Sequence, residues 1–103
     1  MVLYQVTISI DPSIFDDYLL WLKEHIKDLL LLNGFQRASI LQNESKKTEV
    51  MVHYMVESRE MLEEYFNQGA HKLRKAYPPK FEGKFSITRH IYDEVLSLNS
   101  SIR

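Results

Sequence analysis

Residues 2–10 read VLYQVTISI, and this stretch decides the fold. Its side chains alternate between the two sides of the chain, with Tyr4, Val6, Ile8 and Ile10 on one side and Gln5, Thr7 and Ser9 on the other. A period of two residues predicts a β-strand whose faces meet different surroundings. Residues 35–42, 50–57 and 84–92 repeat the pattern. The sequence therefore predicts four strands, each with an apolar face that must be covered and a mixed face whose use is open.

Two helices are predicted between these strands. The first is expected to begin at residues 11–13, Asp-Pro-Ser, because aspartate caps exposed amides and proline fits the first helical turn. Its apolar side chains keep helical spacing to about residue 31, and the Asn-Gly pair at 33–34 favours a stop. The second helix is expected to begin after Ser58 and to continue to about Ala76, because two prolines follow at 78 and 79.

The predicted order of elements is βαββαβ. Residues 43–47 form a short polar connection, which predicts that the two middle strands are an antiparallel hairpin. Right-handed crossings then place both helices on one face of a four-stranded antiparallel sheet with strand order 4-1-3-2. We therefore predict an α+β, ferredoxin-like fold. Residues 1–94 are expected to form a single domain, and residues 95–103 a C-terminal tail that is loose or a short helix.

The composition excludes several classes of protein. The formal net charge is −1, which gives no field that would attract nucleic acid or an anionic membrane. The chain has no cysteine, so disulfides, thiolate catalysis and cysteine-bound zinc are excluded. The apolar run at residues 29–32 is far too short to cross a bilayer, and the first strand has no signal-peptide pattern. We expect a cytoplasmic protein that partners neither membranes nor nucleic acid.

The face of the sheet turned away from the helices is a mixture. By the alternation it carries Gln5, Thr7, Ser9, Arg37, Ser39, Leu41, Met51, His53, Met55, Ser86, Thr88, His90 and Tyr92. Such a mixture fits a half-enclosed pocket in which a few polar groups orient an apolar ligand. It also fits two sheets packed face to face in a homodimer, and an open, hydrated sheet is the third alternative.

The residues of that face do not favour RNA binding, phosphate binding or metal binding. RNA-binding sheets of this type stack bases on aromatic side chains of the central strands, which here carry none on the mixed face. No glycine-rich phosphate loop follows the first strand, and no cofactor is expected. His53 and His90 share the face, but the first strand separates them by roughly 10 Å, so no metal site is expected.

General acid–base chemistry is the better-supported option. A half-enclosed histidine titrates near neutral pH and can move a proton of a bound substrate. His53 is the preferred candidate, with Arg37 on the neighbouring strand positioned to bind an anion. The alternatives are a histidine that forms hydrogen bonds across a dimer interior and an arginine that pairs with a carboxylate of the partner chain.

A resemblance to a known family adds to this interpretation. The helix segment Trp21-Leu-Lys-Glu-His25-Ile26 is followed by Leu29-Leu30 and by Gly34-Phe35-Gln-Arg-Ala38. This pattern resembles the first-helix-to-second-strand region of dimeric α+β barrel proteins. With Asp11-Pro12-Ser13 and Tyr54-x-x-Glu57-Ser58-Arg59, the chain is most similar to the bacterial domain of unknown function 4286 family. Lys27 departs from the proline that often follows the His-Ile pair, which leaves the end of this helix less sharply defined.

The resemblance implies a homodimer whose two sheets form a barrel, often with an internal cavity. Proteins of that architecture include monooxygenases, lactone isomerases, haem-degrading enzymes and small-ligand regulators, and the fold does not choose among them. Only Trp21 and His25 carry over as positions of functional interest. Trp21 is expected to pack against the sheet or to contact a ligand, and His25 to orient a ligand or to cover the helix end.

These observations lead to one main prediction and two alternatives. The main prediction is a homodimer that binds a small organic ligand between its two sheets, through Arg37, His53, His90 and Trp21. The first alternative is a cofactor-independent monooxygenase or isomerase with His53 or His25 as the catalytic base. The second is a structural or regulatory dimer without a ligand.

Overall fold

The computed structural model describes residues 1–74 and 76–101. Its elements, in order, are β1 (Val2–Ile10), η1 (Pro12–Ile14), α1 (Phe15–Leu29), β2 (Phe35–Gln42), β3 (Glu49–Val56), α2 (Arg59–Gln68), α3 (Ala70–Arg74), η2 (Pro79–Phe81) and β4 (Phe85–Asp93).

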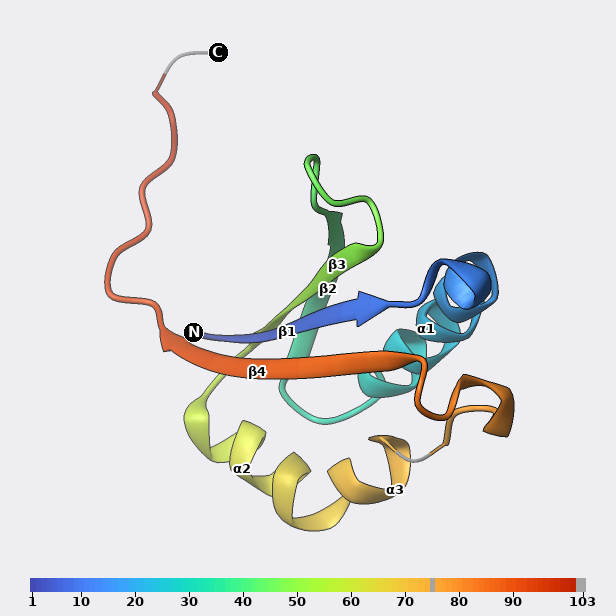
Figure 1. Ribbon diagram of the computed structural model, residues 1–103. Helices are drawn as coiled ribbons and strands as arrows, with labels where there is room; N and C mark the ends of the chain where they lie inside the picture. Colours follow the sequence, from blue (N-terminus) through green and yellow to red (C-terminus); the bar gives the residue numbers. More distant parts are fainter. Residues whose placement is uncertain (75, 102–103) are drawn as a thin grey trace.

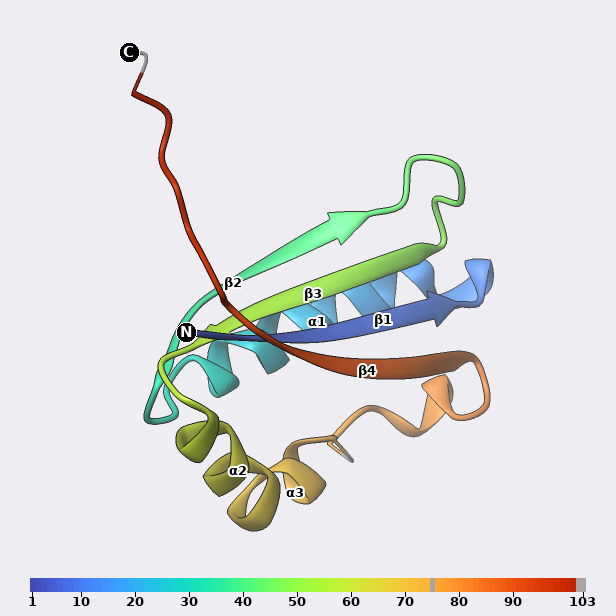
Figure 2. The same ribbon diagram turned by 90° about the vertical axis from the view of Figure 1, so that its left-hand side faces the viewer.

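The four strands form one antiparallel sheet in the order β2-β3-β1-β4. This is the predicted order read from the other edge, and the ferredoxin-like α+β fold is confirmed. The helices α1, α2 and α3 all lie on one side of the sheet (Figure 1). A view turned by 90° shows the four strands side by side, with the helical layer behind and below them (Figure 2). The other side of the sheet carries no helix in the described part of the chain.

The strand boundaries agree closely with the sequence prediction, and one helix differs. β1 and β2 have the predicted bounds, whereas β3 and β4 differ from them by one residue at each end. The second predicted helix is divided at Gly69 into α2 and the short α3. Glycine is among the least favourable residues inside a helix, and it accounts for the break. The prediction of one continuous helix to Ala76 was wrong.

Local hydrogen bonds explain where the helices begin. The Asp11 carboxylate accepts hydrogen bonds from the Ser13 backbone N–H at 2.9 Å and from the Ser13 hydroxyl at 2.7 Å. The first turn is the short 3-10 helix η1, and α1 follows it directly. Ser58 caps α2, because its hydroxyl accepts a hydrogen bond from the Met61 N–H at 3.3 Å. Both caps lie where the sequence predicted them.

The core lies between the sheet and the helices. Along β1 every second side chain is buried, from Val2 to Ile10, and β3 shows the same alternation. The buried positions of α1 are Tyr18, Leu22, Ile26 and Leu29. Their spacing places them on one side of the helix, facing the sheet. The core is rich in aromatic rings, and this composition shapes the candidate site.

The described part of the predicted tail, residues 95–101, forms neither helix nor strand. It leaves the sheet beside the N-terminus and extends away from the body of the molecule (Figures 1 and 2). The Glu94 N–H still donates a hydrogen bond to the Met1 carbonyl at 3.0 Å. Beyond that point Val95, Leu96 and Leu98 are 94%, 73% and 82% exposed. Residues 102–103 of the predicted tail lie outside the described residues.

Within the described ranges, no helix has both the length and the apolar character needed to cross a membrane.

Candidate functional site: a cavity between sheet and helices

A small cavity lies in the core between the sheet and α1. Its volume is about 30 Å³. Space of that size holds a water molecule or a single ligand atom, and not a whole organic molecule. The walls are mostly aromatic and aliphatic, and the side chains with polar groups among them are Tyr4, Tyr18, Trp21, His25, Tyr54, Tyr65, Tyr77 and Arg89.

Trp21 and His25 form one wall of this cavity. They are one helical turn apart on α1, and their rings stack with centroids 4.8 Å apart and planes inclined by 17°. The Trp21 indole N–H donates a hydrogen bond to the Ala76 carbonyl at 3.1 Å. This bond joins the first helix to the segment that follows α3. The indole therefore has a fixed orientation, and its ring covers one side of the imidazole.

The surroundings of His25 favour its neutral form. Burial lowers the pKa of His25 below its ordinary value of 6.5, Asp28 opposes that change, and the positive charge of Arg89 adds to it. A neutral imidazole has one nitrogen that donates and one that accepts a hydrogen bond. At neutral pH, His25 can therefore accept a proton from a molecule in the cavity.

Arg89 brings a positive charge to the mouth of the cavity. On β4 it shares the helix-facing side with Ile87 and Ile91, and its side chain is exposed at the edge of the sheet. Its charge opposes the effect of burial on the pKa values of Tyr18 and Tyr54. The Arg89 side chain is thus exposed to solvent at the edge of β4 and also lines the aromatic cavity.

A surface groove lies next to the cavity at the same edge. It has a volume of about 480 Å³ and is lined by Tyr4, Phe66, Arg89, His90 and Ile91. Tyr4 and Arg89 line both spaces, so the groove and the cavity adjoin at these two side chains. A volume of this order lies within the range of small-molecule sites, which is roughly 300–1,000 Å³.

Two tyrosines of the cavity wall bury their hydroxyl groups. Tyr18 on α1 and Tyr54 on β3 are 1% and 2% exposed. In the described part of the chain, neither hydroxyl has a hydrogen-bond partner. Burial raises the pKa of both phenols, and Tyr18 contributes to the raised pKa of Tyr54. The two phenols are therefore close to one another, and both keep their protons at physiological pH.

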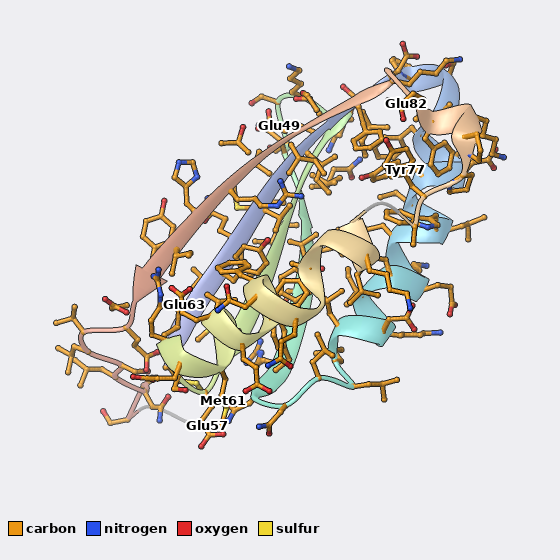
Figure 3. All side chains as sticks on the ribbon, turned by 90° about the horizontal axis from the view of Figure 1, so that it is seen from below. Glu49, Glu57, Met61, Glu63, Tyr77 and Glu82 are labelled. Carbon is orange, nitrogen blue, oxygen red and sulfur yellow. The ribbon has the colours of Figure 1, made fainter. Side chains whose placement is uncertain are left out.

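Tyr77 also lines the cavity. Its hydroxyl donates a short hydrogen bond to the Glu82 carboxylate, which raises the pKa of Tyr77. Figure 3 shows the two side chains together at the end of the molecule where η2 lies. The Tyr77 ring contacts Trp21 edge-on at a centroid distance of 6.4 Å and Phe85 at 5.0 Å. The segment after α3 is therefore fixed to the cavity wall by rings and hydrogen bonds.

The opposite face of the sheet carries a polar row. Ser39, His53, Gln5 and His90 lie side by side on β2, β3, β1 and β4, in that order. As predicted, β1 separates the two histidines. One ring nitrogen of His53 lies 2.8 Å from the Met51 sulfur. This row lies on the side of the sheet that no described helix covers.

A match to a family model shows which family the chain belongs to. A model of the family described as "Domain of unknown function (DUF4286)" matches residues 1–95. The chain belongs to this family. The description of the family names no activity. The resemblance to this family that the sequence motifs indicated is confirmed. A search of proteins with curated descriptions finds no match.

Solved structures share the fold of this family member at low sequence identity. A heme-degrader from Mycobacterium tuberculosis, with two hemes bound in its active site, has a TM-score of 0.77 at 13% identity, covering 96% of this chain and 100% of that one. SnoaB from Streptomyces nogalater, a cofactor-independent oxygenase, has a TM-score of 0.67 at 11% identity, covering 96% and 97%. An antibiotic biosynthesis monooxygenase has a TM-score of 0.72 at 13% identity, covering 93% and 100%. Such likenesses show the fold alone, which is the ferredoxin-like α+β fold.

The predicted site residues of this DUF4286 chain fall into two groups. Trp21 and His25 line the cavity. Arg37, His53 and His90 belong to the opposite face by strand register, although His90 also borders the groove at the edge of β4. Trp21 therefore does not share a site with Arg37 and His53 within one chain. The predicted grouping combined residues from the two sides of the sheet.

Sequence reasoning did not single out Arg89, Tyr18 or Tyr54. The alternation placed Arg89 on the apolar, helix-facing side of the last strand, where a charged residue is unusual, and that exception was the available signal. Tyr18 and Tyr54 occupy apolar core positions that suit an aromatic ring, so the alternation and helical spacing give no sign that their hydroxyl groups are functional. Among the described residues, no group of three or more His, Asp or Glu side chains is placed to hold a metal ion.

Proposed function

We propose that the protein is a homodimer that binds one small organic ligand per chain, in the groove and cavity between its sheet and its helices. The observation that carries this proposal is the shared boundary of the two spaces. Tyr4 and Arg89 belong to both, so the two spaces are neighbours, and we expect a ligand lying in the groove to reach the core between these two side chains. The sequence placed the ligand between two sheets, and the geometry supports the helix side better.

The chemistry of the walls supports an organic ligand. Aromatic rings line the cavity, Arg89 supplies a positive charge at the mouth, and His25 supplies a neutral imidazole inside. Small-molecule sites combine apolar walls with a few polar groups that fix orientation. A solved structure with this fold is a heme-degrader with two hemes bound in its active site. We transfer from it only the expectation that the ligand is organic.

The homodimer is proposed from the uncovered face of the sheet. That face includes Leu3, Met51 and Met55, whose side chains are half-buried in the single chain. A second copy packed on this face would bury these apolar groups and would enclose the row of His53 and His90. The exposed apolar side chains of the tail would add contacts between copies. The cytoplasmic location expected from the sequence stays a prediction.

Native mass spectrometry of the purified protein tests both parts of the proposal. We expect a dimer that carries a retained organic molecule. Replacing Ile87 by Phe fills the cavity wall and should release that molecule. Ile40→Phe is the matched control, because Ile40 is on the helix-facing side of β2 and does not line the cavity. A monomer would contradict the dimer, and equal ligand retention in both variants would contradict the location of the site.

An enzyme is the second candidate function, favoured by His25. Its lowered pKa suits a general base at neutral pH, and His53 lies on the other side of the sheet from the cavity. In this case His25→Gln should retain the bound molecule but abolish its conversion in air. Mass spectrometry of the ligand before and after incubation measures that conversion. Loss of conversion in His53→Gln instead would place the chemistry between the sheets.

A further inference from the structure

Two buried hydroxyl groups in the cavity wall have no partner in the described part of the chain. Tyr18 and Tyr54 are almost completely buried, and their rings are well packed. Tyr18 contacts Phe81 and Phe85 at centroid distances of 5.3 and 5.0 Å, and Tyr54 stacks on Tyr4 at 5.6 Å. Buried polar groups in native proteins are nearly always hydrogen-bonded, so each exception requires a bound water or a ligand atom.

These hydroxyl groups act as donors. Burial raises the pKa of each phenol, so the O–H groups remain protonated at physiological pH. Both line the same cavity of about 30 Å³. A space of that volume, bordered by the side chains of both tyrosines, accommodates one oxygen atom that accepts hydrogen bonds. A neutral carbonyl oxygen meets this requirement better than an anion, because the surrounding walls are largely apolar.

The groove imposes a different requirement on the rest of the ligand. Arg89 stands where the groove and the cavity adjoin, and its side chain is exposed. A guanidinium group binds carboxylates with two parallel hydrogen bonds. The neighbouring groove walls include the rings of Tyr4 and Phe66. The groove therefore favours a flat apolar body with a carboxylate within reach of Arg89.

We propose that the ligand class is a flat aromatic keto acid, whose carbonyl oxygen accepts hydrogen bonds from the hydroxyls of Tyr18 and Tyr54 while its carboxylate pairs with Arg89. This inference rests on the proposed function, because it names the chemistry of the ligand for that site. It adds the two phenols as the groups that select a carbonyl at the inner end.

Three naphthalene probes separate these contributions. The first, 6-acetyl-2-naphthoate, carries both the ketone and the carboxylate. The second, 6-isopropyl-2-naphthoate, lacks the ketone, and the third, 2-acetylnaphthalene, lacks the carboxylate. Trp21 is the single tryptophan of the chain and lines the cavity, so its fluorescence reports binding. Calorimetry supplies an independent dissociation constant for each probe.

The expected result is a specific pattern across the variants. Tyr18→Phe and Tyr54→Phe keep the rings and remove only the hydroxyls, so each should weaken the acetyl naphthoate about fivefold and leave the isopropyl naphthoate unchanged. Arg89→Gln should weaken both naphthoates and spare the neutral ketone. Tyr92→Phe, on the opposite face of the sheet, is the matched control and should change nothing.

Other outcomes overturn the inference in distinguishable ways. If the acetyl and isopropyl naphthoates bind equally, or if both tyrosine variants bind as the unmodified chain does, the hydroxyls hold an ordered water only. Ligand binding in the cavity would then survive as the proposed function, provided that Ile87→Phe still abolishes it. Failure of all three probes at millimolar concentration overturns the keto-acid class, and a retained molecule in the native mass spectrum decides the proposed function separately.

Discussion

Trp21 and His25 stack face to face on α1, with ring centroids 4.8 Å apart. The indole is held in place by its hydrogen bond to the Ala76 carbonyl. It shields one side of the imidazole from water, and this shielding contributes to the burial that lowers the pKa of His25. We therefore expect the contact with Trp21 to contribute to keeping His25 neutral, beside the effects of Asp28 and Arg89.

The first prediction concerns the pH dependence of stability. The pKa of His25 is lowered in the folded state relative to its ordinary value of 6.5, so between those two values the unfolded chain binds more protons. The free energy of unfolding should therefore fall as the pH falls through 6.5 towards the lowered value. His25→Gln should remove this part of the pH dependence. Thermal unfolding followed at several pH values measures it.

Direct titration of the imidazole checks the cause. The NMR signal of the His25 ring should titrate below the ordinary pKa of 6.5 in the unmodified chain. Trp21→Leu should move that pKa upward, because it admits water to the ring face. Leu20→Ala is the control, since Leu20 is 64% exposed on the same helix and lies outside the cavity wall. An unchanged His25 pKa in Trp21→Leu would show that the stacked ring does not cause the shift.

The second prediction concerns the buried hydroxyl of Tyr18. Because no described residue forms a hydrogen bond with this group, Tyr18→Phe should leave the free energy of unfolding unchanged or raise it by about 1 kcal/mol. Tyr18→Leu is the comparison, because it removes the ring and should cost about 2 kcal/mol or more. Urea denaturation of the ligand-free protein measures both. A loss above about 1 kcal/mol in Tyr18→Phe would mean that the hydroxyl is already hydrogen-bonded in the free protein.

Much of the fold could be predicted from the sequence because alternation is a strong signal. The stretch 2–10 alternates without interruption, and β1 has those bounds in the structure. The break at Gly69 was missed because apolar spacing continues through Leu73, and spacing alone hides the weak helical preference of one glycine. Alternation and helical spacing therefore predict where strands and helices lie. They do not predict the break between α2 and α3, which depends on the helical preference of Gly69 as well as on apolar spacing.

The candidate site was only partly predictable for a related reason. Alternation tells which side of a sheet a residue faces, and it correctly placed His53 on the uncovered side. It cannot predict which side of the sheet holds a cavity, because the cavity depends on how closely side chains of a helix, such as Tyr18, pack against side chains of a strand, such as Tyr54. Those residues are 36 positions apart in the sequence. The resemblance supplied Trp21 and His25, which do line the cavity.

The third prediction separates backbone strain from steric clash at two glycines. Gly34 and Gly83 both have positive φ angles, +87° and +74°, so alanine at either position should cost about 1 kcal/mol in backbone strain. At Gly34 an added Cβ would also lie 2.7 Å from the Met61 Cβ, whereas at Gly83 it would meet open space. Gly34→Ala should therefore cost about 1–3 kcal/mol more than Gly83→Ala.

A double-mutant cycle tests the cause of that difference. Met61→Gly removes all the side-chain atoms that the new methyl group would meet, including the Cβ, so it should recover most of the additional cost in the Gly34→Ala background. Urea denaturation of the four chains gives the coupling energy. Additive effects of the two substitutions would mean that Met61 is not the obstacle, and equal costs at Gly34 and Gly83 would leave only backbone strain.

The fourth prediction concerns the uncovered face of the sheet. Met51 lies on the central strand β3 beside Thr7 and Leu41, with its side chain half-buried and turned away from the core. If a second copy covers this face, Met51→Glu places two carboxylates in the interface, where an unpaired charge costs several kcal/mol. The dimer should dissociate while each chain stays folded. Light scattering over a micromolar concentration series, with far-ultraviolet circular dichroism, measures both.

Leu20→Glu is the matched control for this experiment, because it introduces the same charge on the exposed side of α1, behind the helical layer. It should leave the mass of the dimer unchanged, since no contact between copies is expected there. Two results would contradict the face-to-face dimer. One is a monomeric mass for the unmodified chain at micromolar concentration. The other is an undiminished dimer in Met51→Glu, which would place the contact between copies at the strand edges or the tail instead of the open face.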